Sequence, residues 1–239
     1  IREDGCYEVR RLAHSIASMV STMRHLMDDI ILQEKRKRRS ELEVLQSQIN
    51  PHFLYNTLDS VIWMTEAGRY DEAIQMVTSL ARLFRISISR GHELIPIRSE
   101  LQHAESYLQI QSHRYKNQFS YSFDVQEECL DYLCNKITLQ PIIENAAVYG
   151  MKRSDHLFIS LSACLDGSSV VLRVTDNGPG IEPEMLRQLK ACLTDVHAER
   201  GDHFGIMNVH ERIRLIYGDQ YGISIESQVE KGTTVLLRF

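Results

Sequence analysis

The sequence predicts an α+β fold, in which long N-terminal helices precede a two-layer α/β sandwich with helices on one face of a mixed sheet. Apolar residues near the start are spaced alternately three and four apart, and helical spacing continues to about residue 86. From residue 119 onward, apolar residues alternate with polar ones, as in strands. We expect a signalling coiled-coil helix over 1–40, a helical hairpin over 41–95 and a globular domain over 96–239.

The composition indicates a globular protein that does not bind nucleic acid. The 239 residues carry a net charge of −5, whereas nucleic-acid binding needs a basic face. The basic run 35–39 is interpreted as a solvated helix segment, with contact to a membrane surface as the alternative. The five cysteines form no C-x-x-C pair, which indicates reduced thiols in a cytosolic compartment. Because the sequence begins at Ile1 and has no apolar run that could cross a membrane, we expect a fragment anchored through upstream segments.

The first helix carries a heptad seam, which is typical of helices that pair with copies of themselves. The seam consists of Val9, Leu12, Ile16, Met19, Met23, Leu26 and Ile30. The alternative is a single amphipathic helix that packs on a globular body. The seam lapses after Ile31 and resumes at Leu42, a step that a strict 3.5-residue repeat does not accommodate.

The stretch 48–56 places His52 between two helical runs. Pro51 removes one backbone donor and should bend the helix. His52 lies at the edge of the apolar face, about 100° round from Phe53. Because imidazole is a nucleophile at neutral pH, we interpret His52 as the acceptor of a phosphoryl group, with a buried or capping histidine as the alternative. Asn56 follows one turn later on the same face.

A second helix completes the hairpin after a turn over 66–71, where Gly68 should break the first helix. Two such helices from each of two chains would form a four-helix bundle. The apolar side of the second helix consists of Ala73, Ile74, Met76, Val77, Leu80, Leu83, Phe84 and Ile86. Residues 95–97 should form an extended link, and a third helix over 99–115 should be capped by Ser99.

The globular domain should contain five strands and three further helices. Alternation of apolar and polar residues implies a sheet with one covered face. The strands are expected at 119–125, 157–163, 170–174, 223–225 and 234–238, and the helices near 136–149, 183–193 and 206–217.

Glycine-punctuated stretches of this domain indicate a nucleotide pocket. Asp176 follows a strand directly, and a carboxylate there can accept a hydrogen bond from the adenine amino group. Gly178 and Gly180 permit a turn and close approach to the base. Gly205 opens a helix whose N-terminal amides can bind phosphate, and 182–203 would close over the nucleotide as a lid.

With these motifs, residues 8–239 resemble the cytoplasmic part of LytS/YesM-type sensor histidine kinases of bacterial two-component systems. Of these motifs, the stretch around His52 is the most specific to this family. Residues 8–19 look like the second helix of a HAMP linker, with Arg10 in place of the usual glycine, and 100–114 match a further family pattern. The stretches 139–146, 176–180, 203–209 and 231–234 resemble the N box and the later boxes of the GHKL ATP-binding fold, which gyrase, MutL and heat-shock chaperones share.

The resemblance implies roles for individual residues. Asn145 would offer its carbonyl oxygen to Mg²⁺, and Glu144 would orient or deprotonate the acceptor unless it is a surface carboxylate. Asn56 would orient water for dephosphorylating a partner. The implied ATP-binding residues are Asn145, Asp176, Gly178, Gly180, Gly205, Ile206, Asn208 and one of the pair Thr233 and Thr234.

The sequence departs from the family pattern at several positions. Pro141 stands where hydrolysing relatives carry a glutamate, which favours transfer to a side chain over ATP hydrolysis. Val148 and Tyr149 replace a lysine and a histidine, and His203 replaces a glycine. Phe53 stands where many histidine kinases carry an acidic base.

We therefore expect the cytoplasmic portion of a bacterial cell-membrane protein. It would be a homodimer through its N-terminal helices, transfer phosphate from ATP with Mg²⁺ to His52, and pass it to an aspartate of a separate response regulator. The alternatives are a GHKL-type ATPase switch and a degenerate, nucleotide-binding scaffold. A zinc site formed by His197, His203 and His210 is disfavoured, because no cysteine pairs with them.

Overall fold

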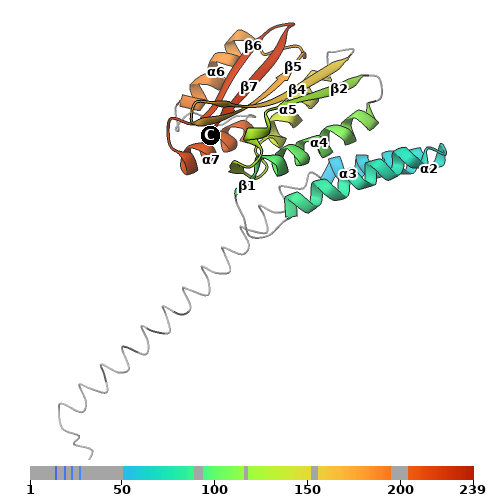
Figure 1. The fold of residues 1–239 in the computed structure, drawn as a ribbon, viewed down its shortest axis with the longest axis horizontal. Helices are drawn as coiled ribbons and strands as arrows, with labels where there is room; N and C mark the ends of the chain where they lie inside the picture. Colours follow the sequence, from blue (N-terminus) through green and yellow to red (C-terminus); the bar gives the residue numbers. More distant parts are fainter. Residues whose placement is uncertain are drawn as a thin grey trace, which may run out of the picture. The chain divides into compact units, whose positions relative to one another are not determined.

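The computed structural model describes residues 51–88, 94–115, 118–151, 156–194 and 204–239, together with residues 14, 19, 23 and 27 (Figure 1). Contacts divide the chain into two compact units, 1–54 and 55–239. Met19 and Met23 of the heptad seam are exposed helical residues. The rest of the seam, the basic run 35–39 and the helix expected before Pro51 lie outside the described residues.

The predicted helical hairpin consists of α2 (Pro51–Glu66) and α3 (Tyr70–Ile88). Gly68 has a φ of 74°, and the backbone N–H groups of Gly68 and Arg69 donate to the carbonyl oxygens of Thr65 and Met64. These two bonds form a Schellman motif, which satisfies carbonyls that the end of α2 leaves unpaired. The turn predicted at Gly68 is therefore confirmed.

The next helix, α4 (Ile97–Arg114), packs against α3. The Ser79 hydroxyl donates to Gln109 Oε1 over 2.8 Å, and Ser87 Oγ lies 2.8 Å from His103 Nε2. His103 is fully buried, and burial lowers its pKa to about 4, with the positive charge of Lys136 adding to the effect. α4 is therefore joined to α3 by polar contacts as well as by apolar packing.

The predicted start of this helix is wrong. Pro96, not Ser99, is the N-cap residue, and no side chain caps the helix. The backbone N–H groups of Ile97 and Arg98 instead donate to the carbonyl oxygens of Tyr132 and Leu130. The expected link is a short strand, β1 (Leu94–Pro96), which pairs with β3 (Leu133–Asn135) and brings these carbonyls to the start of α4.

A five-stranded mixed sheet has the order β2-β4-β5-β7-β6, and it confirms the five predicted strands. β2 pairs with β4 in parallel, and the other neighbours are antiparallel. The strands are β2 (Phe119–Val125), β4 (Leu157–Asp166), β5 (Ser169–Asp176), β6 (Gly222–Gln228) and β7 (Gly232–Arg238). A 3₁₀ turn, η1 (Glu127–Cys129), follows β2.

Helices cover one face of the sheet, as predicted (Figure 1). They are α4 together with α5 (Gln140–Gly150), α6 (Pro183–Thr194) and α7 (Phe204–Tyr217). Alternate strand residues such as Ile159, Leu172 and Leu237 are fully buried beneath them. α5 begins at residue 140 rather than near 136, because β3 and a turn at Ile137 precede it. None of the helices within the described ranges is long and apolar enough to span a bilayer.

Candidate functional site

Asp176 lies at the end of β5, on the face of the sheet that the helices cover. Its Oδ1 accepts hydrogen bonds from the backbone N–H groups of Gly178, over 2.9 Å, and Thr233, over 3.3 Å. Burial raises the pKa of the Asp176 carboxyl, and the two backbone donors oppose that rise. The carboxylate is thus held in place while its second oxygen carries none of these bonds, which suits an acceptor for an amino group.

The glycines around Asp176 leave no room for side chains. Gly180 has a φ of 70°, and a Cβ there would lie 2.1 Å from the carbonyl oxygen of Gln228. Gly232 has a φ of 105°, and its Cβ would lie 1.9 Å from the Asp176 carbonyl oxygen. A Cβ at Gly178 would lie 2.8 Å from Asp176 Oδ1. This backbone is compact enough to form the wall of a pocket for a flat base.

The two candidate threonines point to opposite faces of β7. Thr233 pairs with Asp176 across the ladder and shares its face with the buried Val235. Thr234 faces the other way, and its hydroxyl lies 3.1 Å from that of Thr175. The neighbour of the Asp176 carboxylate is therefore Thr233.

Ser227 is a residue of this site that sequence reasoning missed. Its hydroxyl donates to the Gly232 carbonyl oxygen, accepts from the backbone N–H of Ile181 and lies 2.9 Å from Thr233 Oγ1. It thereby fixes the glycine loop to the β6–β7 hairpin. A serine in an alternating strand gives no sequence signal for this role.

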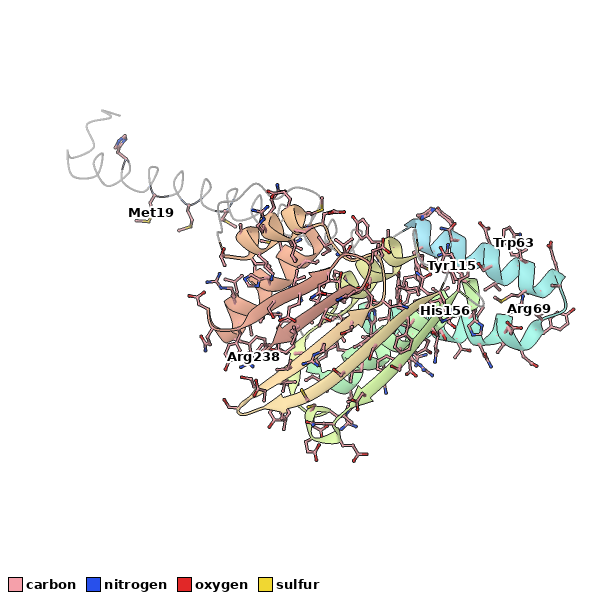
Figure 2. The ribbon with its side chains drawn as sticks, turned by 90° about the horizontal axis from the view of Figure 1, so that it is seen from above. Met19, Trp63, Arg69, Tyr115, His156 and Arg238 are labelled. Atoms are coloured by element: carbon pink, nitrogen blue, oxygen red, sulfur yellow. The ribbon has the colours of Figure 1, made fainter. Side chains whose placement is uncertain are left out.

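Asn177 has a structural role beside Asp176. Its Oδ1 accepts from the backbone N–H of Phe158, and its Nδ2 donates to the carbonyl oxygen of His156, which Figure 2 labels. These bonds extend the pairing of β4 and β5 by one residue. In the Asp-Asn-Gly run, Asp176 thus lies on the helix-covered face of the sheet, while the Asn177 side chain holds the end of β5 to β4.

α5 carries both predicted N-box residues. Glu144 and Asn145 are half-buried, and Glu144 Oε1 accepts a hydrogen bond from Gln140 Nε2 over 2.7 Å. Burial raises the pKa of Glu144, and the bond from Gln140 opposes that rise. An amide oxygen is a hard ligand of the kind that Mg²⁺ accepts, so the Asn145 side chain fits the expected ion.

The predicted phosphate end involves the start of α7. Gly205 is half-buried, and a Cβ there would lie 3.3 Å from the Cβ of Pro141 in the first turn of α5. Ile206 is buried, so only its backbone is available to a ligand, whereas Asn208 is exposed. The N-terminal turns of α5 and α7 thus lie next to each other, with the positive ends of both helix dipoles at the same place.

His52 and Asn56 lie one turn apart on α2. His52 is exposed and Asn56 is half-buried, while Phe53 between them is buried. The alternative of a buried histidine at position 52 is therefore wrong, whereas that of a capping histidine stays open.

Two of the family departures are surface residues. Val148 and Tyr149 are about half exposed in the last turn of α5, and His203 lies outside the described residues. Of the three histidines of the zinc alternative, His197 and His203 lie outside the described residues, and His210 Nδ1 accepts from the backbone N–H of Ile223.

Two family models match this chain. Residues 40–119, which include His52, match the model described as histidine kinase. Residues 135–239 match the model described as histidine kinase-, DNA gyrase B-, and HSP90-like ATPase. The chain belongs to the histidine kinase family.

Relatives of this histidine kinase chain match over almost its whole length. It is 32% identical to the sensor histidine kinase YesM of Bacillus subtilis (strain 168) over 96% of this chain. It is 30% identical to YpdA of Escherichia coli (strain K12) over 95%, and 30% identical to the sensor protein LytS of Bacillus anthracis over 94%. The chain spans less than two fifths of the length of each of these relatives.

Solved structures of histidine kinases also match. The histidine kinase domain of the blue-light activated kinase from Erythrobacter litoralis matches with a TM-score of 0.46 at 13% identity, covering 83% of this chain and 89% of that chain. The catalytic domain of the kinase ThkA matches with a TM-score of 0.47 at 14% identity, covering 61% of this chain and 95% of that chain.

Proposed function

We propose that this chain is the kinase portion of a sensor histidine kinase, which phosphorylates His52 from ATP. The observation that carries the proposal is the exposed imidazole of His52 within the segment that matches histidine kinases. The same chain carries an ATPase-type domain, in which Asp176 is held as a hydrogen-bond acceptor.

In this proposal a ring nitrogen of His52 attacks the γ-phosphorus of ATP. A P–N bond forms, the P–O bond to ADP breaks, and the ring loses its proton. Asp176 and Thr233 bind the adenine end. Gly178 and Gly180, which have no side chains, let the base approach the backbone. The backbone amides of Gly205, Ile206 and Asn208 bind phosphate. Thr233 takes this part in preference to Thr234, because it shares a face with Asp176.

Mg²⁺, when bound, would neutralise charge on the phosphates, as in other phosphoryl transfers. Asn145 is the residue we assign to hold it. Glu144 is our candidate for orienting His52 or receiving its proton, a role that suits a carboxyl group whose pKa burial raises.

We further propose that the protein is homodimeric through its N-terminal helices and lies on the cytoplasmic side of a bacterial membrane. The phosphoryl group would pass from His52 to an aspartate of a response regulator. Asn56, one turn after His52, would orient a water molecule that removes the phosphoryl group from that response regulator.

The decisive experiment is incubation of the full chain with γ-labelled ATP and Mg²⁺. We expect acid-labile, base-stable label on the wild type and on His14→Ala, which alters another exposed helical histidine, and no label on His52→Ala. Label that persists in His52→Ala would place the acceptor elsewhere. Nucleotide binding without label would favour a scaffold, and release of phosphate without label would favour an ATPase switch.

A further inference from the structure

Glu100 is a fully buried carboxylate on α4 that the proposed reaction does not use. Its Oε1 accepts hydrogen bonds from the backbone N–H groups of Thr138, over 2.6 Å, and Leu139, over 2.8 Å. Its Oε2 accepts from the backbone N–H of Ile137, over 2.9 Å. A buried charge is costly unless hydrogen bonds compensate it, and three successive amides offset part of that cost here.

The segment that Glu100 holds leads directly into α5. Ile137 has a φ of 57°, a left-handed conformation that is rare for a β-branched residue and persists only where the surroundings enforce it. Leu139 is the N-cap residue of α5, and no side chain of α5 caps the helix. Glu100, on another helix, therefore fixes the turn from which α5 starts.

α7 holds the same segment from the other side. The Arg212 guanidinium donates from Nη2 to the carbonyl oxygen of Lys136 over 2.9 Å, and Asn135 Nδ2 donates to the Arg212 carbonyl oxygen. Burial raises the pKa of Glu100, while the hydrogen bonds from Leu139, Ile137 and Thr138 and the charge of Arg212 oppose that rise. The start of α5 is thus held between α4 and α7.

We propose that Glu100 is a positioning residue for the metal–phosphate end of the nucleotide site. By fixing the turn before α5, it sets the direction in which Glu144 and Asn145 project. This inference rests on the proposed function, because it assigns Asn145 to Mg²⁺. The adenine end, built on β5 and β7, does not depend on the Glu100 carboxylate.

The test is Glu100→Gln, which keeps the shape of the side chain but replaces one oxygen by an NH₂ group. Oε1 of the glutamine can still accept from Thr138 and Leu139, but its NH₂ group would face the N–H of Ile137 donor to donor. Affinity is measured by titration with an ATP analogue that cannot transfer its γ-phosphate, once in Mg²⁺ and once in EDTA. The comparison distinguishes an effect on the metal–phosphate end of the site from an effect on the adenine end. We expect binding in Mg²⁺ to weaken about tenfold, as when outer-shell partners of metal ligands are removed, and binding in EDTA to change less than about twofold.

Glu105→Gln is the matched control, because it makes the same change on the same helix at a half-buried position; it should bind like the wild type. Unchanged affinity of Glu100→Gln in Mg²⁺, or equal losses in Mg²⁺ and EDTA, would overturn the inference and leave the proposed function intact. A wild type that binds no nucleotide would overturn both.

Circular dichroism would reveal whether Glu100→Gln folds. If it does not, amide hydrogen exchange on the wild-type chain tests the proposal instead. The amides of residues 137–139 should exchange more slowly when the analogue and Mg²⁺ are added together than with the analogue in EDTA. Equal exchange in the two conditions would overturn the proposal.

Discussion

At the scale of single residues, Asp176 shows how a binding site can work against stability. Burial raises the pKa of its carboxyl, so the folded chain without nucleotide binds a proton more tightly than the unfolded chain. The cost of the buried charge is absent below the ordinary pKa of about 4 and appears as the pH rises through the raised value.

We therefore expect Asp176→Asn to lose ATP affinity without losing stability at neutral pH. The asparagine Oδ1 can still accept from Gly178 and Thr233, but its NH₂ group cannot accept from an adenine amino group. Loss of a hydrogen bond to a charged group, about 1.5–3 kcal/mol, should weaken ATP binding by about 10–100-fold. Thermal unfolding between pH 4 and 7 should show that the Tm of the variant rises relative to that of the wild type as the pH rises.

Asp124→Asn is the control for this prediction, because Asp124 is an exposed carboxylate on β2. It should leave ATP affinity unchanged. An Asp176→Asn variant that binds ATP like the wild type would remove Asp176 from the adenine site.

Single residues also show where sequence reasoning reached its limit. Asp176 was predictable because a carboxylate that follows a strand and precedes two spaced glycines forms a local pattern. The choice between Thr233 and Thr234 needed the register of β7 against β5. Glu100 was not predictable, because its partners lie almost forty residues away and are backbone groups, which leave no mark in the sequence.

At the scale of elements, the turn between α2 and α3 depends on the conformation of Gly68. A Cβ there would meet nothing within 4 Å, so strain of the backbone is the only cost of a side chain. Gly68→Ala should lower the free energy of unfolding by about 1 kcal/mol, or the Tm by about 2–4 °C. Gly68→Asn should cost less, because asparagine tolerates the left-handed conformation.

Thermal unfolding of the two Gly68 variants beside the wild type measures both effects, with asparagine as the control for adding a side chain. Equal losses for alanine and asparagine would mean that contacts of the side chain, not backbone strain, set the cost at this position.

Elements with strong periodicity were predictable, and their boundaries were predictable only where local chemistry sets them. β2 was placed correctly because its aromatic residues alternate with polar ones, and Gly68 correctly ended α2. The start of α4 was misplaced because carbonyl groups of Leu130 and Tyr132, remote in sequence, serve its first amides. Ser99 resembles a cap in isolation, but tertiary contacts make that cap unnecessary.

At the scale of the whole molecule, the helical hairpin leaves apolar residues exposed in two stripes. Tyr55, Leu58 and Ile62 form one stripe on α2, and Tyr70, Ile74 and Val77 form the other on α3. Trp63, labelled in Figure 2, is also exposed on α2. Another face of α3, with Met76 and Leu83, is buried within the chain. Exposed apolar stripes at helical spacing indicate a surface that another helix covers.

We expect a second copy of the chain to cover these stripes. Ile62 and Ile74 lie at the same distance along the chain from Gly68. In an antiparallel hairpin they are therefore at the same height above the turn. Burying an isoleucine side chain contributes about 1.5–3 kcal/mol, and a twofold interface loses each contact twice. The double variant Ile62→Glu/Ile74→Glu should therefore weaken the dimer by more than about tenfold.

Sedimentation over a range of concentrations measures this change in dimer affinity. Leu215→Glu is the matched control, because Leu215 is an exposed apolar residue, 84% exposed, that lies on α7 outside the stripes. Both variants replace exposed residues, so both should fold, and only the hairpin variant should dissociate. Equal dimer affinities for the wild type and the double variant would show that the stripes on α2 and α3 are not the surface through which two copies pair.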